Sequence, residues 1–554
     1  MSASTAELTR PPSRPETPPT GGSRSGHLAG GRLYLVLVAL ALIIAALSLL
    51  LPSTPSYDPW SWLIWGRQII HLDLQTAGGP SWKPLGVLMT TIFAPFGSAQ
   101  PDLLLVASRA GALLAIAMTF RITWRIGRPL VAEFTGGEVS GWALLPVLLG
   151  AAVAAASLIN SPSFITDNGL GYSEGLMTAL VLIALDRHLD GARRQAFVIG
   201  FFAALDRPEL WLLWGPYGLY LWWQDRGAWK LVLGLFGLTF VGWFVFSLWG
   251  SGSLLGAVTR ALHPRSNSAA FAKCPICTEF VHHAWPRVMF RVKVVGLLAM
   301  AVAAFGLWHT RRTWWRRDSI NRGTWARLLL VLVGVVGWLW WIGVSLETQL
   351  GFSGNDRYLV LGTALIAITG GVGWGWIAAA LASLLRRAKP RALLTRARTL
   401  TATSVAGTAV ALVVGIAMPP WIGPSVLDVS ATHGALVYQA HLRQDMSRAI
   451  RELGGTKRVL ACGTVMTEGF QVPMLAWNLD VKILRVEAQP TPPPGQLAPG
   501  PPPNVIFQTR DTRHAALLPL PDQIIAWEHD GAHYYEKTIR TFHVFSTCPF
   551  EVST

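Results

Sequence analysis

Long apolar segments alternate with short polar links along most of the 554-residue chain. Segments of about 20 predominantly apolar residues have the length that a helix needs to cross the hydrocarbon core of a bilayer. The alternation predicts about eleven such helices, and polar turns separate the shorter ones. They are expected at residues 33–52, 102–122, 141–159, 174–187, 196–205, 210–223, 231–249, 293–308, 328–346, 358–384 and 402–419. The pattern therefore predicts an α-helical polytopic membrane protein.

The polar links fall into two classes by charge. The links 311–322 and 386–398 are strongly basic, as is the tail before the first span, whereas the link 160–174 contains no Lys or Arg. Basic links stay in the cytoplasm. We therefore expect a cytoplasmic N-terminus and extracytoplasmic links after alternate spans. The first outer link, 56–85, contains a helix that is expected to lie on the membrane surface.

Two end regions differ from this pattern. Residues 1–32 are rich in Ser, Pro, Thr, Gly and Arg, and they are expected to form a disordered cytoplasmic tail. Residues 33–420 form the predicted transmembrane domain. Residues 421–554 contain no further span, so we expect an extracytoplasmic α/β domain. Its predicted elements are an amphipathic helix at 432–453, buried strands at 458–463 and 504–509, an edge or final strand at 541–548, and a Pro-rich linker at 491–503.

Composition supports a membrane protein and bears on its partners. The chain is 51% hydrophobic and only 14% charged, whereas a soluble protein of this size needs more charge to cover its surface. The net charge of +16 could indicate nucleic-acid binding. However, Lys and Arg are concentrated in short links between apolar runs, which favours membrane topology and lipid headgroups. We therefore expect contact with the lipid bilayer and no nucleic-acid partner.

The four cysteines lie in two expected outer regions. Cys274 and Cys277 share the link before residue 293, and Cys462 and Cys548 belong to the C-terminal domain. Outside the cytoplasm, both pairs are expected to form disulfides. The alternative for the first pair is a zinc site completed by His282 and His283, and the short disulfide loop is favoured over it.

Ionisable residues gather at the expected outer ends of the spans. A channel would have polar residues through the depth of its spans, and a proton-coupled carrier would have ionisable groups in mid-span. The arrangement instead favours a reaction at the outer membrane surface on a lipid-borne substrate. The residues concerned are Asp58, Lys83, Asp167, Glu174, Arg207, Glu209, Asp356 and Arg357.

Short motifs in this order resemble the glycosyltransferase C (GT-C) superfamily over about residues 50–420. They are Asp58 in YDPW, Lys83 in SWKPL, Asp167 in TDNGLGYSEG, Arg109 in SRAGALLAI, and NDRYLVL at 355–361. The resemblance implies a GT-C-like fold and a polyprenyl-phosphate sugar as donor. Two departures are the single acid in the first outer loop and Leu85 in place of the second proline of a Lys-Pro-Pro form. Whether Asp58 and Asp167 hold a divalent cation, Mg²⁺ or Mn²⁺, is therefore left open.

The expected roles follow from the chemistry of sugar transfer. Asp58 is the predicted base that takes the acceptor's proton, with helix capping before Pro59 as the alternative. Asp167 is expected to act beside it. Substrate binding is assigned to Lys83, Arg109, Glu174, Arg207, Glu209, Asp356 and Arg357. The cations would hold the leaving phosphate.

Structural alternatives stand beside these roles. The cations could be snorkelling residues at the membrane interface. Asp167 and Glu174 could cap the helix at 174, with Ser173 as the cap. Arg207 and Glu209 could form a structural ion-pair cluster with Asp206, and Asp356 could pair with its neighbour Arg357.

The sequence thus predicts a plasma-membrane glycosyltransferase. It would move a sugar from a polyprenyl-phosphate donor to an extracytoplasmic glycan, lipid or protein acceptor. A lipid-linked-sugar transporter or flippase is one alternative. A non-catalytic scaffold for assembly of the cell envelope is the other.

Overall fold

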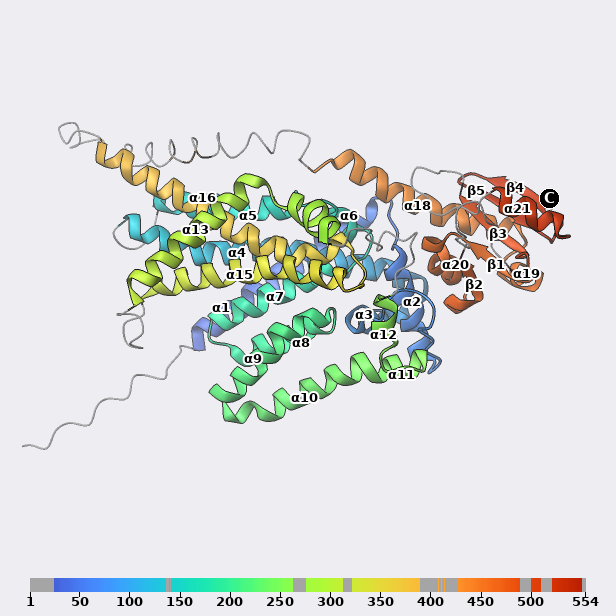
Figure 1. The fold of residues 1–554 in the computed structure, drawn as a ribbon, viewed down its shortest axis with the longest axis horizontal. Coiled ribbons are helices and arrows are strands. Elements are labelled where there is room, and N and C mark those ends of the chain that lie inside the picture. The colour runs from blue at the N-terminus through green and yellow to red at the C-terminus, as the bar shows by residue number, and fades with distance from the viewer. Residues whose placement is uncertain are drawn as a thin grey trace, which may run out of the picture.

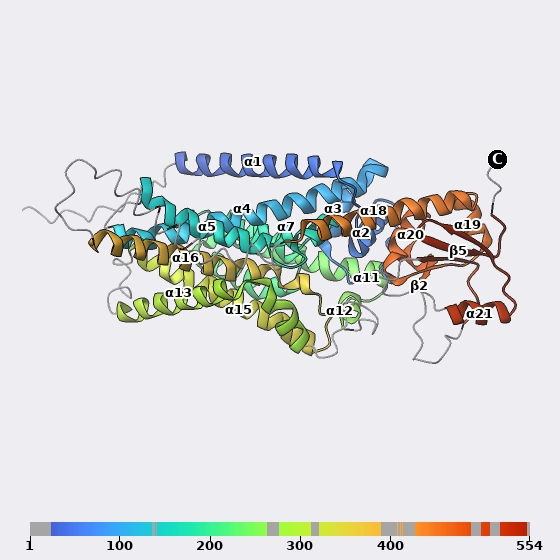
Figure 2. The same ribbon diagram turned by 90° about the horizontal axis from the view of Figure 1, so that it is seen from above.

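A computed structural model describes residues 24–135, 139, 141–262, 276–311, 321–388, 407, 410, 413, 427–488, 500–509 and 521–550. A bundle of long helices is continued at one end by a small α/β domain (Figure 1). The same end-to-end arrangement is visible from above, where α1 runs along the outside of the bundle (Figure 2).

The centre of the bundle is α16, which packs along α5, α13, α15 and α4. Gly150 of α5 and Gly371 of α16 permit a close approach, because a Cβ added to Gly150 would lie 2.4 Å from the carbonyl oxygen of Gly371. Small residues at such crossings are typical of membrane helices. The bundle helices are α1 (Arg24–Leu47), α4 (Gln100–Thr135), α5 (Leu144–Ile159), α7 (Glu174–Leu189), α13 (Phe290–His309), α15 (Arg322–Gln349) and α16 (Val360–Ala388).

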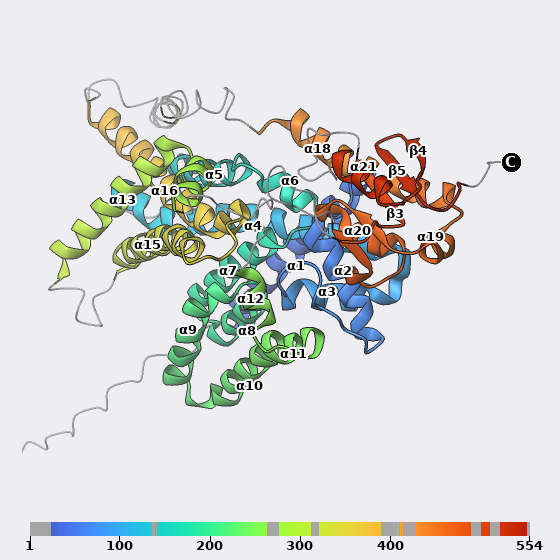
Figure 3. The ribbon, with the colours of Figure 1, turned by 45° about the vertical axis from the view of Figure 1, so that its right-hand side comes forward.

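A second group of shorter helices lies beside the bundle, and Figure 3 shows it next to α7. A π-helical turn at Val241–Val245 joins two of its members, α10 and α11. The group comprises α2 (Tyr57–Ile70), α3 (Pro84–Phe93), α8 (Arg193–Ala204), α9 (Trp211–Gln224), α10 (Trp229–Phe240), α11 (Phe246–Ser251) and α12 (Gly256–Ala261).

Six segments of the described chain are long and apolar enough to cross a membrane. They are Gly31–Leu50, Pro84–Phe134, Arg226–Ser251, Phe290–His309, Arg322–Gln349 and Asp356–Leu384. The chain is therefore a multi-pass membrane protein. Helices α5, α7, α8 and α9 have 12 to 16 residues. The span expected at 402–419 lies outside the described residues except for positions 407, 410 and 413.

The C-terminal domain contains a five-stranded sheet in the order β2-β1-β3-β5-β4. β1 is parallel to β2 and β3, whereas β5 is antiparallel to β3 and β4. The strands are β1 (Val465–Thr467), β2 (Val486–Ala488), β3 (Val505–Thr509), β4 (Tyr535–Ile539) and β5 (Phe542–Ser546). The helices are α18 (Val429–Glu452), α19 (Thr456–Cys462), α20 (Val472–Asn478) and α21 (Pro521–His529).

Two of the three expected strands are confirmed, and one is wrong. Segment 504–509 contains β3, and segment 541–548 contains β5, which lies inside the sheet rather than at its edge. Segment 458–463 belongs to the helix α19, not to a strand. Only Val459 of that helix is buried, so its apolar residues do not form the continuous buried face of a strand.

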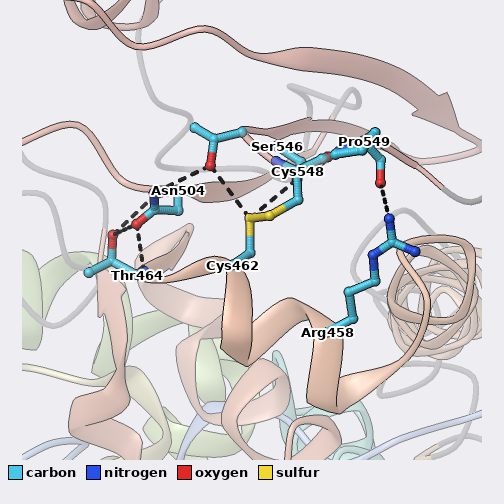
Figure 4. Close-up of a disulfide and its surroundings, with 8 residues drawn as sticks. Arg458, Cys462, Thr464, Asn504, Ser546, Cys548 and Pro549 are labelled. Carbon is cyan, nitrogen blue, oxygen red and sulfur yellow. Dashed lines mark hydrogen bonds between the residues drawn. A yellow bond between two sulfur atoms is a disulfide. The ribbon is translucent and has the colours of Figure 1, made fainter.

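A disulfide ties the end of α19 to the last residues after β5. Cys462 and Cys548 are bonded, as expected from the sequence. Figure 4 shows Arg458 beside this bond, donating to the carbonyl oxygen of Pro549 at 2.9 Å. In the other predicted pair, Cys274 and Cys277, Cys277 is disulfide-bonded. Cys274 lies outside the described residues.

The C-terminal domain and the second group of helices share one apolar core around α2. Trp60 of α2 packs against Trp477 of α20 with ring centroids 5.6 Å apart, and Arg67 forms an ion pair with Asp480. The expectation that this helix lies on the membrane surface is wrong. Its residues Trp60 to Trp65 are at most 1% exposed, because α3 covers one side and the C-terminal domain another.

Candidate active site

Three cationic side chains reach one carboxylate oxygen, Oε1 of Glu174. The distances are 3.2 Å from Nζ of Lys83, 3.0 Å from Nη2 of Arg207 and 3.2 Å from Nε of Arg357. All four residues are at most 9% exposed. They come from four separate segments of the chain, and we call them, together with Asp58 and Glu209, the Glu174 cluster.

Arg357 connects this carboxylate to Asp58. Its Nη2 lies 2.6 Å from Oδ2 of Asp58, while its Nε faces Glu174. The capping alternative for Asp58 is wrong, because Ser56 is the N-cap of α2 and Asp58 lies in the first turn. Glu209 completes the set through Nη1 of Arg207 at 3.2 Å.

Proline residues explain how the sequence positions these side chains. Lys83 and Arg207 each precede a proline that opens a helix, so both have extended backbones as N-caps. The residue before proline is excluded from the helical region, and proline itself suits the first helical turn. Both side chains therefore leave the chain just before a helix begins. Glu174 also lies at the start of a helix, as the first residue of α7.

Aromatic rings surround the three cations. The guanidinium carbon of Arg207 lies 3.3 Å from the ring centroid of Tyr358, and that of Arg357 lies 4.0 Å from the centroid of Tyr172. Nζ of Lys83 lies 5.5 Å from the rings of both Trp62 and Tyr358. Rings in these positions attract the cations through their quadrupoles and fix their direction.

Neighbouring charges act against burial at Arg207. Burial by itself lowers the pKa of Arg207, but Glu209, Tyr358 and Glu174 outweigh burial and hold this pKa above its ordinary value. Several buried polar atoms nevertheless have no hydrogen-bond partner among the described residues. They are Oδ2 of Asp167, Oε2 of Glu174, Nε of Arg207 and Oε2 of Glu209. A concentration of unsatisfied buried atoms is typical of a site that binds a polar ligand.

Asp167 lies close to the Glu174 cluster without joining it directly. It belongs to the short helix α6 (Phe164–Gly169), rather than capping α7. Burial, together with the neighbouring carboxylate of Asp356, raises its pKa from 3.8 to about 8. At neutral pH the Asp167 side chain is therefore mainly protonated, which makes it a hydrogen-bond donor.

Asp356 pairs with a residue that sequence reasoning missed. Its Oδ2 accepts from Nη2 of Arg287 at 2.8 Å, so the structural alternative of a pair with its neighbour Arg357 is wrong. Arg287 is 1% exposed and also donates to Oγ of Ser161 at 3.1 Å. The available signal was its place in the sequence, directly after Trp-Pro at the end of an outer link.

Arg109 holds the backbone around the site. Its Nη1 donates to Oγ of Ser48 at 2.8 Å, and its Nη2 donates to Ser53 and, at 2.9 Å, to the carbonyl oxygen of Gly169. It thus links the end of α1 to the end of α6. The structure places Arg109 in this linking position rather than among the cations around Glu174.

The sequence raises two possible metal sites. Among the described residues, no three His, Cys, Asp or Glu side chains gather where they could hold a metal ion. Asp58, the first of the two expected ligands, is engaged by Arg357. His283 bonds to Glu279 at 2.9 Å instead of completing a zinc site. A divalent cation at Asp58 and Asp167 stays a prediction, and in the structure the cations of the chain face the carboxylates of the site.

Solved structures similar to this chain include two of one protein. One is ArnT from Cupriavidus metallidurans bound to undecaprenyl phosphate, with 13% identity, a TM-score of 0.47, and coverage of 95% of this chain and 98% of that one. The other is the same protein in the apo state, with 14% identity, a TM-score of 0.38, and coverage of 94% and 98%. No family model and no curated protein matches the chain. At these scores the functional conclusion rests on the site itself.

Proposed function

We propose that the chain is a membrane glycosyltransferase that uses a polyprenyl-phosphate sugar and an extracytoplasmic acceptor. The observation that carries this proposal is the convergence of Lys83, Arg207 and Arg357 on Glu174, with Asp58 attached through Arg357. The cluster lies where the bundle meets the C-terminal domain. A lipid-borne donor can reach that end of the bundle from the membrane and a polar acceptor from outside.

The three cations would bind the phosphate of the donor. Each of them now shares one oxygen of Glu174, although together they offer many more donor hydrogens than one oxygen can accept. Phosphate oxygens are strong partners for such groups, especially for arginine. Cations fixed in this way stabilise the negative charge that develops on the leaving phosphate.

Asp58 would act as the general base. The acceptor hydroxyl attacks the anomeric carbon and forms the new glycosidic bond. The bond from that carbon to the phosphate oxygen breaks, and its electron pair leaves with the polyprenyl phosphate. Asp58 takes the hydroxyl proton, and Arg357 holds the carboxylate in position. Protonated Asp167 would donate a hydrogen bond to the sugar or to the phosphate.

The transporter alternative requires a polar route through the bundle. On α7, about 18 Å of helix separates Glu174 from Asp186, the next buried acid. The residues between them that face the core include Met177, Ala179 and Leu182, each 0% exposed. This apolar interval favours an enzyme that works at one face over a carrier that moves the sugar through the bundle.

The test is the variant Asp58→Asn in membranes supplied with a labelled polyprenyl-phosphate sugar and acceptor. Transfer of the label should fall roughly 100- to 10,000-fold, the usual contribution of a general base, while the protein level is retained. Asp73→Asn is the matched control, since Asp73 is an exposed acid of the same outer link. Undiminished transfer by Asp58→Asn would remove Asp58 as the base.

A further inference from the structure

A second polar feature lies apart from the Glu174 cluster. A cavity of about 360 Å³ separates the end of α1 from α18 of the C-terminal domain. Its two walls differ in character: the chain leaving α1 contributes Leu49 and Leu51, whereas α18 contributes Arg443, Ser447 and Arg451. The proposed transfer reaction uses none of these residues.

The α18 wall presents a regular basic stripe. Arg443, Ser447 and Arg451 are spaced four residues apart, so they lie on one face of the helix. The guanidinium of Arg443 is held 4.9 Å from the ring centroid of Trp60. Burial lowers the pKa of Arg443, with an opposing contribution from Asp102. Among the described residues no carboxylate forms an ion pair with either arginine of the stripe.

The opposite wall lies where a candidate span ends. The segment Gly31–Leu50 is long and apolar enough to cross a membrane, and the cavity begins at its last residues. Leu47 and Leu50 point outward, with 60% and 84% of their surfaces exposed. Figure 2 shows α1 along the outside of the bundle. The cavity is thus expected at the level of lipid headgroups, beside the acyl chains.

We propose that this cavity binds the headgroup of an anionic phospholipid. The two arginines and the serine suit phosphate oxygens, which accept charge-assisted hydrogen bonds. The leucines suit the first carbons of the acyl chains. A free phosphate ion could accept the same hydrogen bonds from the arginines and the serine. It would make no contact with the leucines, however, so a phospholipid is the favoured occupant.

Residues that line the cavity are linked by contacts to both segments that carry the acids of the proposed reaction. Arg443 stacks on Trp60, two residues after Asp58. Ser53 also lines the cavity and accepts a hydrogen bond from Arg109. Arg109 in turn donates to the carbonyl oxygen of Gly169, which lies two residues after Asp167. Lipid binding should therefore support transfer. This consequence rests on the proposed function, whereas the binding itself does not.

The experiment measures lipid retention by the purified full-length chain in native mass spectrometry. Phosphatidylglycerol should be retained roughly tenfold more than phosphatidylcholine with the same acyl chains, and Arg451→Gln should abolish most of that preference. Arg448→Gln is the matched control, because Arg448 is an exposed arginine of the same helix outside the cavity. Arg451→Lys should restore part of the preference, which separates lost charge from lost folding.

Three outcomes would overturn the proposal. The first is equal retention of the two lipids by the unaltered chain. The second is equal behaviour of Arg451→Gln and Arg448→Gln. The third is complete displacement of phosphatidylglycerol by millimolar glycerol phosphate, which would assign the cavity to a soluble phosphate. If phosphatidylglycerol is not retained while sugar transfer persists, only the proposed lipid site is wrong. If the lipid is retained while transfer is absent, only the proposed function is wrong.

Discussion

Helix α7 carries a buried ionic cluster at each end, and the two differ in how their carboxylates are paired. At the first residue, Oε1 of Glu174 faces three cations while its Oε2 has no partner among the described residues. In the last turn, both oxygens of Asp186 are paired: Oδ1 with Arg125 at 2.6 Å, and Oδ2 with Arg121 at 2.8 Å and with Tyr34.

We interpret this difference as one between the proposed binding site and a structural joint. The pairing around Asp186 satisfies the acid and fastens α1, α4 and α7 together. Around Glu174, three cations share one carboxylate oxygen, and aromatic rings pack against these cations. A phosphate would relieve that crowding, whereas a ligand at Asp186 would have to displace satisfied bonds.

The largest expected effect on stability is at the Asp186 end. Asp186→Asn would leave Arg121 and Arg125 without their buried partner, which typically costs about 3–5 kcal/mol of stability. Thermal unfolding of the purified chain should occur at a markedly lower temperature, while transfer per folded molecule stays within about twofold of the original. An unchanged unfolding temperature would show that Asp186 is not a structural joint.

At the Glu174 end the effect should fall on activity. Arg357→Lys keeps the charge, but an ammonium lacks the planar fork that bridges Asp58 and Glu174. Transfer should fall roughly 100-fold, equivalent to about 2.7 kcal/mol of transition-state stabilisation. Rate measurements at saturating donor test this. An equal loss in Arg121→Lys, at the Asp186 end, would erase the contrast between the clusters.

Asp167 should make stability depend on pH. The pKa of a carboxyl free in water is 3.8, whereas that of Asp167 in the fold is about 8, so the folded state binds more protons between these two pH values. Stability should therefore fall as pH rises from about 4 to about 8, by at most about 1.4 kcal/mol per pH unit from this group. Asp167→Asn should flatten that part of the profile of unfolding temperature against pH. A profile that is unchanged in the variant would contradict the assignment.

Much of the site could be predicted because charge is rare in a membrane chain. Lys83, Glu174, Arg207 and Arg357 stood out as ionisable residues beside apolar runs, and two of them precede proline. Their meeting at one oxygen could not be predicted, because it depends on how four distant segments pack. Arg287 was missed for the same reason, since its partner Asp356 lies 69 residues away.

Some helices and strands could be predicted from the sequence alone, whereas others depended on packing between distant segments. Long apolar runs predicted the helices α13, α15 and α16, because a run of that length has few other structures available. The short run at 458–463 fits a strand or a helix equally well, and in the structure it belongs to α19, in which only Val459 is buried. The surface position expected for α2 failed because the C-terminal domain covers that helix.

The central claim is that the cations around Glu174 bind the phosphate of a lipid-linked donor. Its most direct test is the affinity of the purified chain for polyprenyl phosphate, measured for the unaltered chain, for Lys83→Gln and for the control Lys482→Gln, whose lysine pairs with exposed Asp73. We expect about tenfold weaker binding for Lys83→Gln, the loss of one charge-assisted contact, and no change for the control. Equal affinity of all three proteins would contradict the claim.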